Sequence, residues 1–409
     1  MKSGLLGRKL SHSYSPAIHA SFGDYPYPLF EREPEDVENF VRFGDWDGVN
    51  VTIPYKKTVL PFLDSVSETV RAVGSANTLV RKNGKIEGHN TDVFGFLYLL
   101  RNSGIRYENA RTIVLGSGGA SVAITHALRT AGIEPVIISR TGEYNYGNLD
   151  RVSDAELIVN TTPVGMYPEN GEAPLSLTRF PKLRGVIDII YNPARTALLL
   201  EAEKLGIANR SGLSMLVAQA ARSSELFTGI SVEDRIEEVT RALDASMENV
   251  VLIGMPGCGK SSAAKLLGKE TGREVIDFDA EIVKRIGKPI PDFFRESGEA
   301  AFRNVETAVA RDFGKLSGKI LSTGGGIVTR PENYELLHQN GQIVFLSREL
   351  SLLPKKGRPI SMSSDLQELY QKRKPMYEAF RDVTVDNSGT LDDCVKRIKE
   401  ALHLTGGME

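Results

Sequence analysis

The sequence predicts an α/β protein that contains two separate modules with parallel sheets. Its 409 residues suggest two or three domains, because a single domain commonly has about 100–200 residues. Short apolar segments rich in β-branched residues recur along the chain, and each is followed by glycine and then by a helical pattern. Such short strands alternating with helices are typical of parallel sheets that are covered on both faces.

The composition is that of an ordinary globular protein. Hydrophobic residues make up 41% and charged residues 25%, and the formal net charge of −2 indicates neither nucleic-acid nor membrane binding. The two cysteines, Cys258 and Cys394, fall in different halves, which argues against a disulfide framework and fits a reducing cytosol. Neither a signal peptide nor an apolar run of about 18 residues is found. We therefore expect a cytoplasmic enzyme.

The expected strands define the organisation of the chain. They cover residues 112–115, 135–138, 157–159, 186–190 and 250–253. The main boundary is expected near residues 244–249, between a helix over residues 232–243 and the last of these strands. The segment that starts at Met247 looks like the opening of a separate protein, which suggests a fusion. We therefore expect domains at 1–246 and 248–409, the first divided into a substrate subdomain (1–102 plus 209–246) and a nucleotide-binding subdomain (103–208).

A glycine-rich turn in the first half indicates a dinucleotide site. Gly116 would permit a tight turn, and Gly118 and Gly119 would let the backbone approach a pyrophosphate at a helix N-terminus. The alternative is a tight strand–helix connection without a ligand. The next strand ends in Ser139, Arg140 and Thr141, where enzymes that use NAD usually place a carboxylate. Because a guanidinium can pair with a 2′-phosphate, NADP is favoured over NAD.

Polar loops near the N-terminus suggest a substrate site. Ser13 and Ser15 could bind a small carboxylate, although they could equally form a turn and a helix cap. Reduction of a carbonyl needs a proton donor at its oxygen, and Lys56 oriented by Asp92 could serve. The alternative is a surface lysine and a helix-capping aspartate.

The second half contains a phosphate loop. Residues 254–261 read GMPGCGKS, in which backbone N–H groups cradle phosphates, Lys260 reaches the β/γ-phosphates and Ser261 binds Mg²⁺. The expected nucleotide-binding residues are Gly254, Gly257, Cys258, Gly259, Lys260, Ser261 and Ser262.

Carboxylates and arginines further along suggest a small anionic acceptor. Asp277 and Asp279 follow a strand, and alternation would direct both to one side, where one could hold Mg²⁺ and the other accept a proton. Arg303 and Glu306 share a helix face, where an ordinary intrahelical ion pair is the alternative. Arg358 lies in a lysine-rich segment, and Arg373 on a later helix.

Residues 1–246 resemble shikimate dehydrogenase. The resemblance is carried by Ser13 to Ser15, NVTIPYK (50–56), NT (77–78), NTD (90–92), GSGGAS (116–121), NTTPVGM (160–166), DIIYNPART (188–196) and GLSMLVAQA (212–220). It implies Lys56 and Asp92 as the catalytic pair, and a substrate pocket formed by Ser13, Ser15, Asn50, Thr52, Asn77, Tyr191 and Gln219. It implies NADP binding by Gly116, Ser117, Gly118, Gly119, Ala120, Ser139, Arg140, Thr141, Gly212 and Met215. One departure is that Glu143 and Tyr144 stand where NADP-dependent members often carry another basic residue.

Residues 248–409 resemble shikimate kinase. The resemblance implies that Asp279 holds the shikimate hydroxyls, that Arg303 and Arg373 bind its carboxylate, and that Gly325 and Gly326 line the same site. It also implies that Arg358 is the lid arginine and that Asp277 and Ser261 organise Mg²⁺. The lid departs from the family pattern, because the chain between Leu346 and Arg358 is short.

Both resemblances concern the same metabolite. We therefore expect an enzyme that reduces 3-dehydroshikimate to shikimate with NADPH and phosphorylates shikimate with ATP and Mg²⁺. The expected architecture is a split dehydrogenase with a Rossmann subdomain, joined to a P-loop kinase with a five-stranded parallel sheet. Two alternatives remain: a first half that prefers quinate and NAD, and a half that is a non-catalytic binding module.

Overall fold

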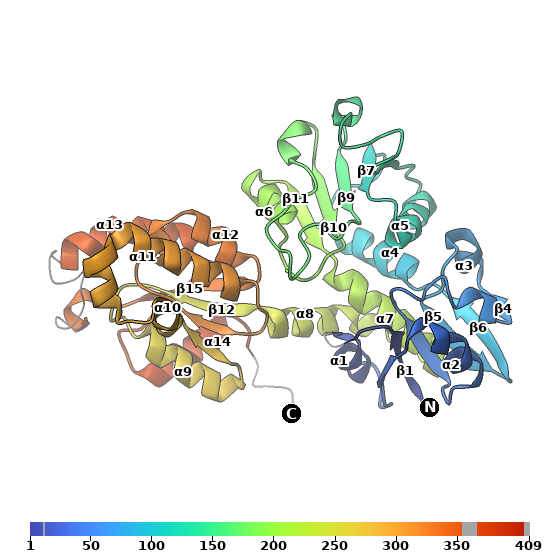
Figure 1. Ribbon diagram of the computed structural model, residues 1–409, viewed down its shortest axis with the longest axis horizontal. Helices are drawn as coiled ribbons and strands as arrows, with labels where there is room; N and C mark the ends of the chain where they lie inside the picture. Colours follow the sequence, from blue (N-terminus) through green and yellow to red (C-terminus); the bar gives the residue numbers. More distant parts are fainter. Residues whose placement is uncertain (11–12, 354–365, 405–409) are drawn as a thin grey trace. The chain divides into compact units, whose positions relative to one another are not determined.

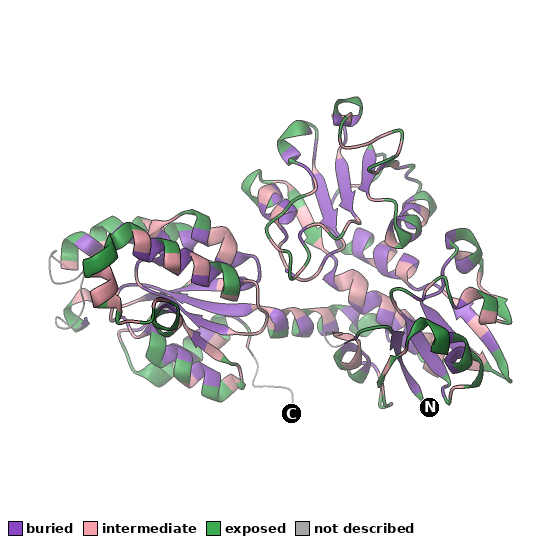
Figure 2. Cartoon of the chain, viewed as in Figure 1, coloured by how far each residue is buried: buried purple, intermediate pink, exposed green. Residues whose placement is uncertain are grey.

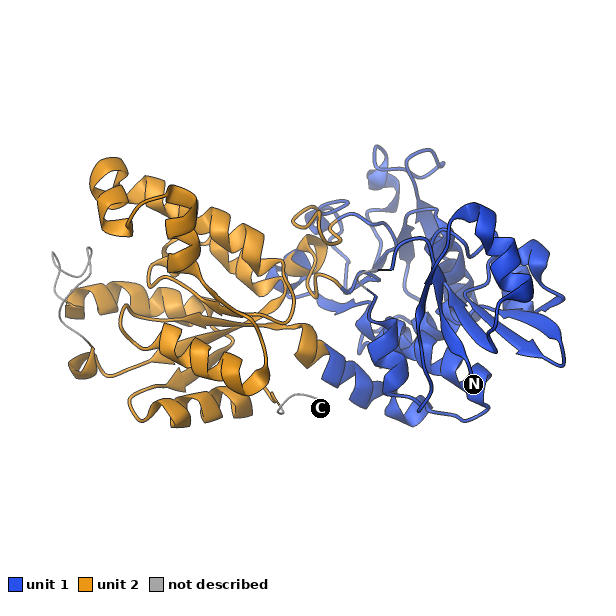
Figure 3. Ribbon diagram, turned by 60° about the horizontal axis from the view of Figure 1, so that its bottom comes forward, with its two compact units in different colours: residues 1–164, 173–191, 201–243 blue, residues 165–172, 192–200, 244–409 orange. Residues whose placement is uncertain are grey.

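The computed structural model describes residues 1–10, 13–353 and 366–404, which form three sheets with their covering helices (Figure 1). The chain divides into two compact units (Figure 3). The first contains residues 1–164, 173–191 and 201–243, and the second contains residues 165–172, 192–200 and 244–409. The interior strands of the two parallel sheets are buried along nearly their whole length (Figure 2), as expected for short apolar strands.

The first sheet is mixed, whereas parallel sheets were expected. Its six strands have the order β2 (Leu29–Glu31), β1 (Ser3–Gly7), β3 (Gly48–Val51), β5 (Thr78–Lys82), β6 (Lys85–His89), β4 (Ser65–Val66). Strand β5 is antiparallel to β3 and to β6. Asn83 and Gly84 connect β5 to β6 with positive φ angles of 50° and 75°. This two-residue Asn-Gly turn is favoured in hairpins, because its twist matches that of the flanking strands.

The second sheet is parallel, as predicted. Its five strands have the order β11 (Ala208–Ser211), β10 (Gly185–Asp188), β9 (Leu157–Asn160), β7 (Thr112–Leu115), β8 (Val136–Ile138). All four strand pairs are parallel. The glycine-rich turn at residues 116–119 therefore follows the C-terminal end of β7, which lies between β9 and β8, and parallel sheets of this kind bind ligands at such ends.

The third sheet has the predicted five parallel strands. Their order is β13 (Val275–Asp277), β14 (Ile320–Ser322), β12 (Asn249–Ile253), β15 (Gly341–Ser347), β16 (Val383–Asp386). The phosphate loop follows β12, the central strand. The core of this unit is one apolar cluster that includes Val251, Leu252, Ile320 and Val344, all fully buried.

Helices cover these sheets. The helices of the N-terminal part are α1 (Ser15–Ala20), α2 (Val37–Phe43), α3 (Glu68–Val73), α4 (Asp92–Asn102), α5 (Gly119–Thr130), α6 (Ala197–Lys204), α7 (Leu213–Thr228) and α8 (Ile236–Met247). Those that follow are α9 (Lys260–Thr271), α10 (Phe278–Ile286), α11 (Ile290–Gly314, with non-helical backbone at Gly298), α12 (Glu332–His338), α13 (Leu366–Phe380) and α14 (Leu391–Ala401).

Two helices, α4 and α7, pack closely against each other and position the first site. A Cβ atom at Gly95 of α4 would lie 2.6 Å from the carbonyl oxygen of Met215 on α7, so only glycine permits this approach. The approach brings the N-terminus of α4, which starts at Asp92, close to the polar side chains of α7. Helix α8 extends to Met247, beyond the predicted end at residue 243, so that only Glu248 separates it from β12.

Candidate active sites

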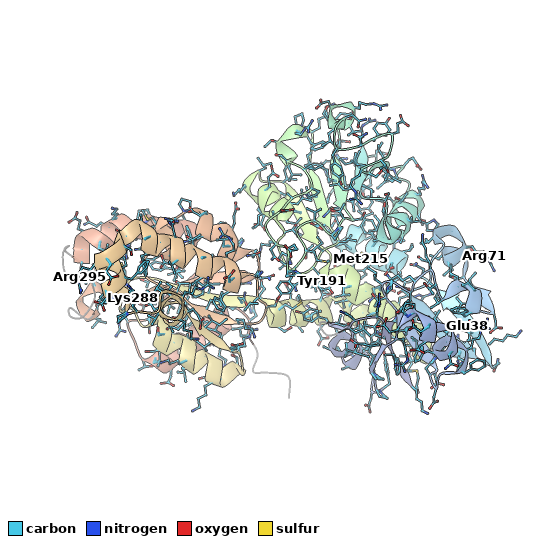
Figure 4. All side chains as sticks on the ribbon, in the orientation of Figure 1. Glu38, Arg71, Tyr191, Met215, Lys288 and Arg295 are labelled. Atoms are coloured by element: carbon cyan, nitrogen blue, oxygen red, sulfur yellow. The ribbon has the colours of Figure 1, made fainter. Side chains whose placement is uncertain are left out.

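A cavity of about 520 Å³ lies in the first unit. It is lined by every residue that we predicted for the substrate pocket and the proton-transfer pair: Ser13, Ser15, Asn50, Thr52, Lys56, Asn77, Asp92, Tyr191 and Gln219. Two residues predicted at the coenzyme, Gly212 and Met215, line it as well. Tyr191 and Met215 can be located within the first unit in Figure 4. Segments far apart in the sequence thus form one polar site.

Lys56 and Asp92 form the ion pair that the proton-transfer hypothesis requires. The Lys56 Nζ atom lies 2.7 Å from Asp92 Oδ2, and the two side chains are 31% and 15% exposed. Asp92 is the first residue of α4, where the helix dipole favours a negative charge. An ammonium held in this way can donate a proton at a defined place in the cavity.

Asn77 orients this pair from the side. Its Nδ2 atom donates to Asp92 Oδ1 at 2.9 Å and to Thr91 Oγ1 at 3.0 Å, and its Oδ1 atom accepts from the Thr91 backbone N–H at 2.8 Å. Both oxygens of the Asp92 carboxylate thus have partners, one from Lys56 and one from Asn77. The carboxylate is therefore held in one orientation.

Our reading of the sequence missed Ser223 and Thr91, which connect the polar residues of the cavity. Ser223 Oγ is fully buried and lies 2.8 Å from Asn50 Nδ2, 2.9 Å from Thr78 Oγ1 and 3.2 Å from Thr91 Oγ1. It also donates to the Gln219 carbonyl at 2.9 Å. Ser223 lies 173 positions after Asn50 in the chain, so no local sequence pattern indicates that the two residues meet.

Tyr27 and His19 hold Asn50 from the other side and were also missed. The Tyr27 hydroxyl donates to Asn50 Oδ1 at 2.6 Å, and the His19 ring stacks on Tyr27 with 3.9 Å between ring centroids. Burial lowers the pKa of His19 to about 3, so the ring is neutral at pH 7. A neutral, stacked ring adds no charge beside the cavity and serves as packing for Tyr27.

The turn after β7 has the shape that a pyrophosphate needs. Gly116 has a φ angle of 106°, and a Cβ atom there would lie 2.8 Å from Thr161 Oγ1. Gly118 and Gly119 have open space where a Cβ atom would project, and α5 begins at Gly119. Ser117 and Ala120 belong to the same turn, whose residues 117–119 are exposed. Open backbone N–H groups at a helix N-terminus fit an anionic dinucleotide.

The segment after β8 carries an available guanidinium. Ser139, Arg140 and Thr141 directly follow this strand, and Arg140 is exposed. Tyr144 occupies the place where a second basic residue was expected, and Arg151 stacks on its ring at 4.5 Å while pairing with Glu143 at 3.1 Å. Arg151 therefore brings a positive charge back to this loop, although Glu143 partly offsets it.

The phosphate loop has the predicted form. Lys260 Nζ donates to the carbonyls of Gly254 at 2.9 Å and Met255 at 3.1 Å, so the ammonium lies across the loop. Gly254, Gly257 and Gly259 all have positive φ angles. Cys258 is buried and its carbonyl accepts from Asn387 Nδ2 at 2.6 Å, which makes it a structural filler. Ser262 follows on the exposed first turn of α9.

The two residues predicted to hold Mg²⁺ also come together. Ser261 Oγ donates to Asp277 Oδ2 at 2.8 Å, although the residues are 16 positions apart. A hydroxyl and a carboxylate are the oxygen ligands that suit Mg²⁺. Our argument from strand alternation was wrong, however, because β13 ends at Asp277 and Asp279 already belongs to α10. Asp277 caps this helix by accepting from the Ala280 N–H at 3.2 Å.

A second cavity, of about 400 Å³, adjoins the phosphate loop. It is lined by Lys260, Ser261, Asp279, Arg303, Gly325, Gly326 and Arg373, as predicted, and by Glu306. Arg303 and Arg373 are only 5% and 4% exposed, which indicates that these cations are built into the site. Arg373 donates to the Gly325 carbonyl at 3.1 Å. A Cβ atom at Gly326 would lie 2.2 Å from the Arg303 guanidinium, so a larger residue there would have to displace this group.

The intrahelical ion pair between Arg303 and Glu306, given above as an alternative, is present, and Glu306 lies inside this cavity. It is fully buried and bonds Arg303 Nη1 at 2.6 Å, and its Oε1 atom has no hydrogen-bond partner in the described part of the chain. Burial raises the pKa of this carboxyl. The sequence showed the spacing of Glu306 from Arg303. It did not show that Glu306 is buried. Arg358, the proposed lid arginine, lies outside the described residues.

Comparison with known proteins identifies relatives of the N-terminal part of the chain. A family model described as the shikimate dehydrogenase substrate binding domain matches residues 5–79. Shikimate dehydrogenase (NADP(+)) of Caldanaerobacter subterraneus is 38% identical over 254 residues, which cover 55% of this chain and 91% of the relative. Shikimate dehydrogenase (NADP(+)) of Clostridium perfringens is 35% identical, and the match covers 95% of its length. This chain belongs to the shikimate dehydrogenase family.

Solved dehydrogenase structures share the fold of this family. Shikimate dehydrogenase 1 of Peptoclostridium difficile has a TM-score of 0.55 and 31% identity, covering 59% of this chain and 98% of that one. Shikimate 5-dehydrogenase of Thermus thermophilus was determined in complex with NADP(H) and shikimate. It has a TM-score of 0.54 and 32% identity, and the match covers 59% of this chain and 99% of that one.

The C-terminal part matches a second family model. The shikimate kinase model covers residues 256–403. The chain therefore combines a dehydrogenase that uses NADP with a kinase domain that uses ATP, and it is a bifunctional enzyme of the shikimate pathway. Across residues 1–10, 13–353 and 366–404, no helix has the length and apolar character needed to cross a membrane.

Proposed function

We propose that Lys56 and Asp92 form the proton-transfer centre of the dehydrogenase. NADPH, when bound, supplies the hydride that reduces the carbonyl carbon of 3-dehydroshikimate. The Lys56 ammonium donates the proton to the carbonyl oxygen, where negative charge develops. The observation that carries this proposal is the 2.7 Å ion pair inside a cavity otherwise lined by neutral polar residues, apolar residues and Lys9.

Substrate placement in this centre follows from the positions of its donors. We assign Ser13 and Ser15 to the carboxylate, and Asn50, Thr52, Asn77 and Gln219 to the ring hydroxyls. The coenzyme residues are Ser139, Arg140 and Thr141 at the ribose, Gly116 to Ala120 at the pyrophosphate, and Tyr191, Gly212 and Met215 near the nicotinamide.

In the kinase we assign Asp279 as the acceptor of the shikimate hydroxyl proton, and Arg303 and Arg373 as partners of the shikimate carboxylate. ATP, when bound, supplies the phosphoryl group. Lys260 and the backbone of the phosphate loop hold the phosphates, and Ser261 and Asp277 hold Mg²⁺. The two nearly buried guanidiniums beside the phosphate loop support this assignment.

The proposed domains are residues 1–246 and 248–409, with the first divided as the sequence suggested. They are supported by the position of β12 directly after Glu248. A cytoplasmic location belongs to the same proposal. It is supported by Cys258 and Cys394, which are buried and form no disulfide in the described chain.

A coupled assay of the full chain tests the proposed function. The purified protein is given 3-dehydroshikimate, NADPH and Mg-ATP, and nicotinamide oxidation and ADP release are followed together. We expect NADPH oxidation first, and ADP release that depends on it. When shikimate replaces 3-dehydroshikimate in the same mixture, ADP should be released without NADPH oxidation. Activity of only one half would support the alternative in which the other half is a binding module.

Replacement of dehydroshikimate by dehydroquinate, and of NADPH by NADH, tests the other alternative. A higher kcat/KM with that pair would contradict the assigned substrate.

A further inference from the structure

The cavity of the dehydrogenase carries an excess positive charge. Three charged side chains line it, namely Lys9, Lys56 and Asp92. Lys56 and Asp92 neutralise each other at 2.7 Å. The charge that remains in the lining is that of Lys9.

Lys9 lies at the serine end of the cavity. The Ser13 N–H donates to the Leu10 carbonyl at 3.1 Å, so the segment that leaves β1 through Lys9 is tied to the segment that carries the serines. Ser13 Oγ accepts the Ser15 N–H at 3.2 Å, which leaves the Ser13 hydroxyl hydrogen able to donate to a ligand. The serines offer neutral donors, and they offer no charge to balance a carboxylate.

The charges near Lys9 do not neutralise it. Arg8 pairs with Glu33 at 2.9 Å, and Glu31 accepts the Leu10 N–H at 2.7 Å. Both carboxylates line a different cavity, together with Arg8. Within the residues that the structure describes, the Lys9 ammonium has no ion pair or hydrogen bond, and its side chain is exposed at the cavity.

We propose that Lys9 is a substrate-binding residue of the dehydrogenase, which attracts and holds the carboxylate that Ser13 and Ser15 bind through hydrogen bonds. This inference rests on the proposed function of the cavity. Shikimate and 3-dehydroshikimate are anions, and an unbalanced cation in the lining of a cleft raises the local concentration of an anionic substrate. Lys9 acts on binding, and the Lys56–Asp92 pair acts on proton transfer.

The experiment compares shikimate oxidation by the full-length wild type with that by Lys9→Gln, Lys9→Arg and Lys9→Glu. Changing one exposed charge at a binding site alters association and its salt dependence more than the chemical step. For Lys9→Gln we expect the KM for shikimate to rise about 3- to 10-fold, with kcat and the KM for NADP nearly unchanged. Lys9→Arg should stay close to the wild type, and Lys9→Glu should raise the KM further.

Salt and an uncharged substrate separate a charge effect from a structural one. Between about 0.01 M and about 0.15 M salt the Debye length falls from about 30 Å to about 8 Å, so the KM of the wild type should rise. This rise should be smaller in Lys9→Gln. Methyl shikimate keeps the ring hydroxyls and lacks the charge, and its KM should be the same in both proteins. The control is Lys57→Gln, because Lys57 is exposed and does not line the cavity.

Three results would overturn the assignment: an unchanged KM in Lys9→Gln, an equal change for methyl shikimate, or the same change in Lys57→Gln. A wild type that does not oxidise shikimate would instead contradict the proposed function itself, so the two failures are distinguishable.

Discussion

At the scale of single residues, both sites depend on charges whose partners the fold provides. Lys56 and Asp92 are 36 positions apart and lie within 2.7 Å, and Ser261 and Asp277 are 16 apart and lie within 2.8 Å. The residue types and their motifs could be recognised in the sequence. Burial could not: the spacing of Glu306 indicated an intrahelical ion pair, and only the structure shows that this residue is fully buried.

Arg140 provides a prediction about the coenzyme. Its exposed guanidinium follows β8, where it can pair with the 2′-phosphate that distinguishes NADPH from NADH. Arg140→Ala should raise the KM for NADPH by at least about tenfold, which corresponds to about 1.4 kcal/mol, and should leave the KM for NADH nearly unchanged. Steady-state kinetics with both coenzymes measure this. Equal changes for the two would show that Arg140 does not contact the 2′-phosphate.

Arg303 provides a prediction about the kinase. Arg303→Lys keeps the charge and loses the planar pair of donors that suits a carboxylate. It should weaken shikimate binding at least about tenfold and leave binding of a non-hydrolysable ATP analogue nearly intact. Calorimetric titration with each ligand measures both affinities. Arg311→Lys on the exposed side of the same helix is the matched control, and it should bind both ligands normally.

The lysine variant is preferred to alanine because Arg303 also pairs with the buried Glu306. Removing one member of a buried pair costs about 3–5 kcal/mol and could unfold the domain. Loss of the nucleotide with normal shikimate binding would refute the carboxylate assignment.

At the scale of elements, helices α4 and α7 determine the geometry of the dehydrogenase site. One starts with Asp92, and the other carries Met215, Gln219 and Ser223. Their contact depends on Gly95, because a Cβ atom at this position would lie 2.6 Å from the carbonyl oxygen of Met215. Because hydrogen bonds between polar residues of the cavity cross this contact, we expect the residues that make them to influence substrate binding without touching the reacting carbonyl.

Ser223 tests this expectation. Ser223→Ala removes a hydroxyl that contacts Asn50, Thr78 and Thr91, and a single hydrogen bond contributes about 0.5–1.5 kcal/mol. We expect the KM for shikimate to rise about 2- to 12-fold, with a smaller effect on the KM for NADP. Ser223→Thr, which retains the hydroxyl, should recover part of the loss.

The control for this experiment is Ser224→Ala on the same helix. Ser224 accepts from the Tyr25 hydroxyl at 2.9 Å and makes no hydrogen bond to Asn50, Thr78 or Thr91. If Ser224→Ala changed the KM for shikimate as much as Ser223→Ala does, general loosening of α7 would explain both results.

At the scale of the whole molecule, each half has a complete set of reactive groups within its own unit. The cavity with Lys56 lies in the first unit, and the cavity with Lys260 lies in the second. We therefore predict that the two activities are chemically independent. Lys260→Ala should abolish phosphorylation and spare shikimate oxidation.

The reciprocal variant completes the test. Lys56→Ala should lower dehydrogenase turnover about 10²- to 10⁴-fold, as is typical for positioned proton transfer, and spare the kinase. Separate assays of both activities, with circular dichroism to verify folding, measure the outcome. Loss of both activities from either change in a folded chain would contradict independence.

The sequence by itself determined the fold class and the family of each half, and it indicated candidate residues for the chemistry. This was possible because glycine turns, the phosphate loop and short apolar strands are local features, which one segment of chain contains in full. The Asn-Gly pair at residues 83–84 was also a local hairpin signal, and we overlooked it.

Only the tertiary structure decided which side chains are buried and which meet. Ser223, Tyr27 and Glu306 became part of the sites because distant segments pack together and remove these groups from water. Lys9 became an unbalanced charge because Asp92 lies beside Lys56 and the neighbouring carboxylates face another cavity. Burial and charge balance depend on all the neighbours of a group in space, and a linear pattern contains only its neighbours along the chain.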